Sequence, residues 1–65
     1  SDVYKRQMMD RVLGDVKAAG YSKIMLWVFD SNVRAIRFYE KYGFTSSGRK
    51  QPALGAVEEM YVRGL

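Results

Sequence analysis

The fold of this chain is decided by the stretch Asn32-Val33-Arg34-Ala35-Ile36-Arg37-Phe38-Tyr39-Glu40-Lys41-Tyr42-Gly43-Phe44. An unbroken apolar run, Ile24–Phe29, precedes it, and three cap-forming residues, Asp30-Ser31-Asn32, separate the two. Because the run does not alternate with polar residues, it predicts a strand covered on both faces. The stretch itself predicts a helix from about Asn32 to Tyr42, ended by Gly43.

The segment before the apolar run has the spacing of one helix face. Its apolar residues fall at i, i+3, i+4 and i+7, namely Met9, Val12, Leu13 and Val16. They predict a helix from Met8 to about Ala19, with Gly20 as the left-handed residue past its end.

Two further strands are expected after the second helix. Phe44 to Lys50 predicts a weaker strand, Gln51–Gly55 holds the only proline and predicts a turn, and Val57 to Arg63 alternates partly. The order is therefore helix, strand, helix, strand, strand, an α/β arrangement in which the strand–helix–strand part predicts a crossover unit. Residues 1–65 are expected to form a single unit.

Composition limits what the chain can bind. It has 65 residues, no cysteine and no histidine, and its acidic residues form no ligand-spaced cluster, so neither a disulfide nor a metal site is expected. The absence of cysteine fits a reducing cytoplasm. No apolar run approaches the roughly 18 residues of a membrane span, so no membrane partner is expected. The net charge of +4 suits an anionic partner.

Three residues of the decisive stretch are candidates for a binding face. Asn32, Ala35 and Tyr39 fall within roughly 60° of one another on a helix. An amide at a helix start suits a polar or anionic ligand, an alanine allows close approach, and a phenol can donate a proton. The structural alternatives are a helix cap for Asn32 and a core position for Tyr39.

The basic residues of the same helix form a second stripe. Arg34, Arg37 and Lys41 are centred about 150° from the candidate face, which predicts a solvated surface. Contact with an outer phosphate of a ligand or with an acidic partner is the alternative.

The decisive stretch resembles the pattern N-x-x-A-x-x-x-Y-x-x-x-G-F of the GNAT superfamily of acyl-CoA-dependent N-acyltransferases. Gly48 and Glu58-Glu59-Met60-Tyr61 also resemble the end of that family, so the resemblance extends over Met8–Leu65. It implies the C-terminal part of a GNAT fold, in which Ile24–Phe29 is the second of two splayed strands. The implied reaction is transfer of an acetyl group from acetyl-CoA to an amine acceptor that the sequence does not identify.

The resemblance also implies residue roles. Asn32 would contact acetyl-CoA near its pantetheine or phosphate portion, and Ala35 would pack against it. Tyr39 would act as the general acid that protonates the departing CoA thiolate.

One family element is missing. GNAT proteins carry a pyrophosphate loop of the form Q/R-x-x-G-x-G/A at the start of the helix that precedes the Ile24–Phe29 strand. In this chain that place is occupied by Ser1–Gln7, which contains no glycine. Asp2–Gln7 looks like what one frame of a transposon-end sequencing adapter encodes. Residues 1–7 are therefore expected to be an artefact fused to a truncated family-like unit, 8–65, with a genuine divergent N-terminus as the alternative. The isolated chain is expected to be inactive and to bind acetyl-CoA weakly or not at all.

Two other functions stay open. A small basic module that binds nucleic acid would explain the charge and the five tyrosines, although no Lys/Arg run interleaves with exposed rings. A structural fragment without a ligand is the other. Because nothing guards the edge of Ile24–Phe29, self-association through that edge is also expected.

Overall fold

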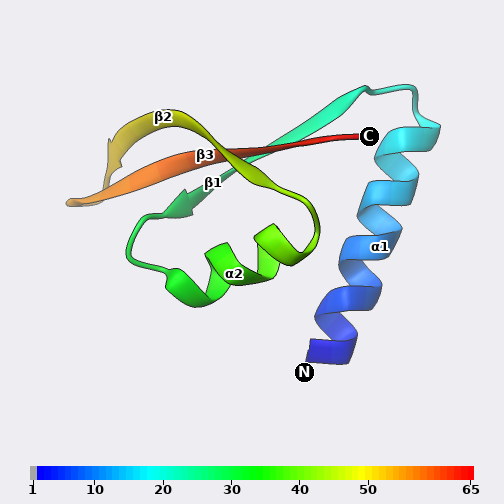
Figure 1. Cartoon of the computed structure of the whole chain (residues 1–65), viewed down its shortest axis with the longest axis horizontal. Helices are drawn as coiled ribbons and strands as arrows, with labels where there is room; N and C mark the ends of the chain where they lie inside the picture. The colour runs from blue at the N-terminus through cyan, green and yellow to red at the C-terminus, as the bar shows by residue number, and fades with distance from the viewer. Residues whose placement is uncertain (1) are drawn as a thin grey trace.

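The computed structural model describes residues 2–65, whose elements follow the predicted order of helix, strand, helix, strand, strand (Figure 1). These elements are α1 (Asp2–Ala18), β1 (Lys23–Phe29), α2 (Val33–Lys41), β2 (Thr45–Ala53) and β3 (Ala56–Gly64). The arrangement is a partial GNAT fold, as the sequence predicts. The second helix has the predicted extent, because Asn32 is its N-cap and Tyr42 its C-cap.

The three strands form one sheet of order β1-β3-β2. β3 is antiparallel to both neighbours, so β1 and β2 run parallel to each other with β3 between them. The predicted crossover through α2 is therefore present, and the last strand occupies the gap that the crossover leaves. β1 lies at an edge of the described sheet and pairs only with β3.

The prediction that β1 is covered on both faces is wrong for this structure. Val28 is buried, with 5% of its surface exposed, whereas Met25, Trp27 and Phe29 are 52%, 36% and 37% exposed. Both helices pack on the face to which Val28 belongs (Figure 1). An apolar residue is compatible with either face of a strand, so the run could not show that only one face is covered.

The first helix begins earlier than predicted. α1 starts at Asp2 instead of Met8 and ends at Ala18. Lys5, Arg6 and Gln7 are good helix formers, and a carboxylate in the first turn interacts favourably with the helix dipole. The predicted start rested on apolar spacing alone, and an exposed first turn carries no such signal.

The β2–β3 hairpin also departs from its prediction. β2 continues to Ala53, so Gln51 and Pro52 belong to the strand and the turn is confined to Leu54-Gly55. Proline is tolerated there because β2 is an edge strand, whose outward N–H has no ladder partner to lose. The last strand, Ala56–Gly64, is one residue longer at each end than predicted.

A small core joins both helices to β1 and β3. Its buried members are Leu13 of α1, Val28 of β1, Phe44 after α2 and Tyr61 of β3. Phe44 is the most deeply buried, with 1% exposed. The core therefore fixes both helices against the same side of the sheet, which places a groove between them.

Candidate functional site

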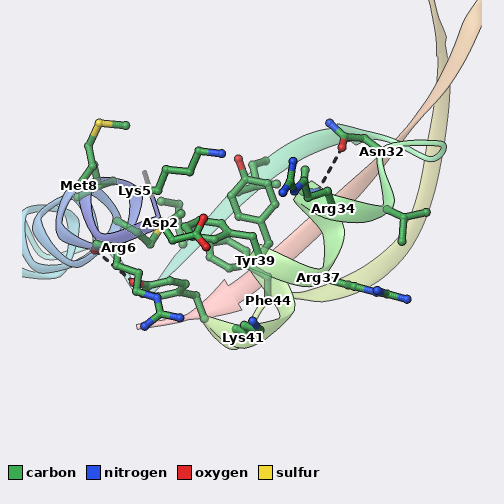
Figure 2. A pocket seen from close by; sticks show the side chains of 18 residues that line it. Asp2, Lys5, Arg6, Met8, Asn32, Arg34, Arg37, Tyr39, Lys41 and Phe44 are labelled. Atoms are coloured by element: carbon green, nitrogen blue, oxygen red, sulfur yellow. Dashed lines mark hydrogen bonds between the residues drawn. The ribbon is translucent and has the colours of Figure 1, made fainter.

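The groove between α1 and α2 has a volume of about 1100 Å³ (Figure 2). The first half of α1 forms one wall and α2 the other, and Ile24, Leu26 and Phe44 contribute apolar lining between them. All three candidate residues predicted from the sequence, Asn32, Ala35 and Tyr39, line this groove. The structure therefore brings the three together.

Asn32 is the N-cap of α2. Its side-chain oxygen accepts a hydrogen bond from the backbone N–H of Ala35, at 3.2 Å. The alternative prediction for Asn32, a helix cap, is thus correct for its side-chain oxygen, which accepts from one of the backbone N–H groups at the helix start. The cap leaves the N–H₂ group of the amide available as a donor to a ligand.

The first turn of α2 offers one more free donor. The N–H groups of Val33 and Ala35 are used within the turn, by the carbonyl of Ser31 at 3.0 Å and by the Asn32 side chain. Within residues 2–65, the N–H of Arg34 has no hydrogen-bond acceptor. A free backbone donor beside a free amide at the start of a helix can bind an oxygen of a ligand.

Tyr39 combines a packed ring with a free hydroxyl. Its ring meets those of Phe38 and Phe44 edge to face, each with centroids 5.6 Å apart. The ring is half-buried against the core, as is Ala35 one turn earlier. In Figure 2 the hydroxyl points into the groove, and no hydrogen bond to it is found within residues 2–65. The hydroxyl is thus held in place by its ring and is open to a ligand.

The charged residues that line this groove are mainly basic, and Asp2 is the acidic exception. Arg34, Arg37 and Lys41 of α2 line it, together with residues from the first turns of α1 that include Lys5 and Arg6. The three α2 side chains are exposed, as predicted, but they border the same groove as Asn32 and Tyr39. Helix angles alone placed the basic stripe apart from the face of Asn32 and Tyr39. They could not predict that α1 packs opposite α2, so that both groups of side chains border one groove. No pattern in the sequence indicated that side chains of α1 would line the same groove.

Tyr42 links the two walls. Its hydroxyl donates a hydrogen bond to the backbone carbonyl of Arg6, at 3.2 Å, although the residues are 36 positions apart. Burial raises the pKa of Tyr42, as does the Asp10 carboxylate, while Arg6 acts in the opposite direction. The neutral phenol is therefore the form that the folded chain favours.

A separate polar cluster lies on the β2–β3 hairpin. Glu59 accepts a hydrogen bond from the hydroxyl of Ser46 and lies 3.9 Å from the ammonium group of Lys50. Two residues after Glu59, Tyr61 has a pKa raised by burial, with Glu59 and then Glu40 adding to the effect. These contacts join β2 to β3 across the bulge between Ser46 and Lys50.

Neither a metal centre nor a membrane span is evident in the described part of the chain. Among residues 2–65, no three His, Cys, Asp or Glu side chains are grouped so that they could hold a metal ion. No helix there is both long and apolar enough to cross a membrane.

Comparison with known proteins adds independent evidence. The acetyltransferase (GNAT) family profile matches residues 6–44, which include α2, β1 and most of α1. Mycothiol acetyltransferase of Streptosporangium roseum is 52% identical over 33 residues. Those residues are 51% of this chain and only 10% of that relative. The family profile thus covers α2, which forms one wall of the groove, and the strand before it. The chain belongs to the GNAT family of acetyltransferases.

Proposed function

We propose that the groove between α1 and α2 binds acetyl-CoA and that this chain supplies the coenzyme side of an N-acetyltransferase. The matched segment is a tenth of its curated relative, so the proposal concerns a larger acetyltransferase in which this segment works. Catalysis by the 65-residue chain alone is not expected. The absence of cysteine suits a cytoplasmic setting.

Binding of the coenzyme would use donors from α2. The amide N–H₂ of Asn32 and the backbone N–H of Arg34 suit the pantetheine carbonyls or a phosphate oxygen, and Ala35 leaves room for the pantetheine arm. The basic side chains of α2 (Arg34, Arg37 and Lys41) suit the phosphates, because Arg and Lys bind phosphate by charge-assisted hydrogen bonds. No metal ion is needed for either contact.

Tyr39 is the proposed general acid. In the reaction the acceptor amine attacks the thioester carbonyl, a C–N bond forms, the C–S bond breaks and the sulfur leaves as a thiolate. Tyr39 would give its proton to that thiolate. The observation that carries this assignment is the Tyr39 hydroxyl, which opens on the groove without a partner in residues 2–65 while its ring is packed against Phe44.

The other proton transfer is left unassigned. The attacking amine must lose a proton, and no described residue is proposed as its base. The acceptor amine is also left unspecified. The family match gives the nucleic-acid alternative no support. The proposed coenzyme carries phosphates and would account for the basic side chains of the groove.

The test is Tyr39→Phe in a complete acetyltransferase domain that contains this segment. The ring packing is retained and only the proton donor is lost, so kcat should fall about 10²–10⁴-fold while KM for acetyl-CoA changes little. Tyr21→Phe is the matched control, because Tyr21 is 67% exposed and does not line the groove. An unchanged kcat in Tyr39→Phe would reduce Tyr39 to a packing residue.

A further inference from the structure

Tyr42 follows α2 directly and is fixed there on several sides. It is the C-cap of the helix, and its backbone N–H donates a hydrogen bond to the carbonyl of Tyr39 at 3.0 Å. Its ring lies 5.2 Å from that of Phe38, centroid to centroid, and it packs against the core cluster. The position of the Tyr42 hydroxyl is therefore set by the end of α2 and by the core.

The hydroxyl of Tyr42 connects the end of α2 to the first half of α1. It donates a hydrogen bond to the backbone carbonyl of Arg6 at 3.2 Å, which is the dashed line beside Arg6 in Figure 2. A helical carbonyl accepts from the N–H four residues later, and its second lone pair remains for such a bond. Because the acceptor is a backbone atom, the contact does not depend on the side chain at position 6.

The core holds α1 farther along the helix. Leu13 is the member of the core cluster that α1 buries, and Met9 packs against that cluster. Lys5 and Arg6, which line the groove, precede both of them. Arg6 is about 10 Å along the helix axis from Leu13, so a small tilt of α1 about its core contact moves the groove lining appreciably. The Tyr42 hydroxyl meets α1 at the turn where such a tilt would change the width of the groove.

The two walls of the groove carry charges of the same sign. Lys5 and Arg6 line it from α1, partly offset by Asp2, and three basic side chains line it from α2. Like charges on facing walls favour their separation. No ion pair among residues 2–65 joins the two walls. The hydrogen bond from Tyr42 to the Arg6 carbonyl joins neutral groups and opposes this separation.

We propose that Tyr42 is a positioning residue for the coenzyme, whose hydroxyl keeps the α1 wall of the groove at binding distance from the α2 wall. The inference rests on the proposed function, which assigns this groove to acetyl-CoA. Tyr42 has no part in the proton transfer assigned to Tyr39. Without its hydroxyl the walls separate in a fraction of the molecules, and the apparent affinity falls with the fraction that keeps the binding shape. The loss of one hydrogen bond should weaken the Kd for acetyl-CoA about fivefold.

A distance measurement tests the position of the walls without a ligand. The chain has no cysteine, so Gln7→Cys and Glu40→Cys place one spin label on each helix, at exposed positions outside the groove lining. In double electron–electron resonance, Tyr42→Phe should widen the distance distribution and move it to longer distances. Tyr61→Phe is the matched control, because it removes the hydroxyl of a buried tyrosine outside the groove and should leave the distribution unchanged. An unchanged distribution in Tyr42→Phe would overturn the proposal.

An NMR titration of the ¹⁵N-labelled chain with acetyl-CoA tests the consequence for binding. Kd should be about fivefold weaker in Tyr42→Phe than in the unsubstituted chain or in Tyr61→Phe, and urea unfolding verifies that both variants fold. A purely structural role would lower stability and leave the Kd of the folded chain unchanged, which would overturn the proposal.

The two measurements together separate the remaining outcomes. Weaker binding of Tyr42→Phe with an unchanged label distance would also overturn the proposal, because the Tyr42 hydroxyl would then contact the ligand directly. If the unsubstituted chain shows no binding of acetyl-CoA, the proposed function fails and the link to the coenzyme is overturned with it. A widened distance distribution in Tyr42→Phe would in that case still support Tyr42 as the residue that holds the walls together.

Discussion

Tyr39 and Phe44 contact each other twice. The N–H of Phe44 donates a hydrogen bond to the carbonyl of Tyr39 at 3.1 Å, and their rings meet edge to face with centroids 5.6 Å apart. Phe44 is also the most buried side chain of the core. The five-residue spacing between tyrosine and phenylalanine thus couples the candidate acid to the core, through the left-handed turn at Gly43.

Substitution of Gly43 tests this turn. Gly43 has φ = +85°, and a Cβ there would lie 3.2 Å from the Nε atom of Arg63. Gly43→Ala should therefore lower the free energy of unfolding by about 1–2 kcal/mol. Gly14→Ala is the control, since Gly14 is helical with nothing within 4 Å of an added Cβ, and it should raise that free energy by roughly 0.5–1 kcal/mol. Urea unfolding measures both, and equal effects would contradict the assigned role of the turn.

The hairpin turn predicts a stabilising substitution. Leu54 is 98% exposed and has φ = +52°, a conformation in which Leu is strained and Asn is not. Leu54→Asn should raise the free energy of unfolding by about 1 kcal/mol, because it removes strain and no packing is lost. Thermal unfolding measures the change. Leu54→Val, which keeps the strain with a β-branched side chain, should destabilise, and a gain in stability there would show that the turn is not strained.

High pH should destabilise the fold through its tyrosines. Burial is the first cause of the raised pKa values of Tyr42 and Tyr61, which lie above 10.0 in the folded chain. Above pH 10 the unfolded chain loses these protons first, so the stability present below pH 10 is lost as the pH rises through the folded pKa values. Urea unfolding at several pH values should show this decline. Tyr61→Phe should flatten it, and an identical decline in that variant would exclude Tyr61 as a cause.

The sequence predicted the elements with strong local signals. The cap at Asn32, the glycine at Gly43 and the apolar run of β1 were sufficient for α2 and the strand before it. The start of α1 and the strand position of Pro52 were missed, because exposed helix turns and edge strands tolerate residues without an apolar pattern.

The candidate site was predictable on one side only. Asn32, Ala35 and Tyr39 lie on a single helix, so helical geometry places them together. Lys5 and Arg6 reach the same groove because the core holds α1 opposite α2, which is a tertiary relationship. The hydrogen bond between Tyr42 and Arg6 likewise joins residues 36 positions apart, and no local pattern predicts it.

The proposed binding of acetyl-CoA at the start of α2 can be tested by an NMR titration of the ¹⁵N-labelled chain with acetyl-CoA. Binding should be weak, with Kd on the order of 1 mM, because the usual glycine-containing phosphate loop is not among residues 1–7. The largest shifts should be those of the Asn32 side-chain amide and the Arg34 backbone N–H, and Asn32→Asp, which keeps the cap oxygen but removes the donor, should weaken binding severalfold. Shifts confined to the β2–β3 hairpin, or none at these two donors at near-saturating acetyl-CoA, would contradict the proposed binding.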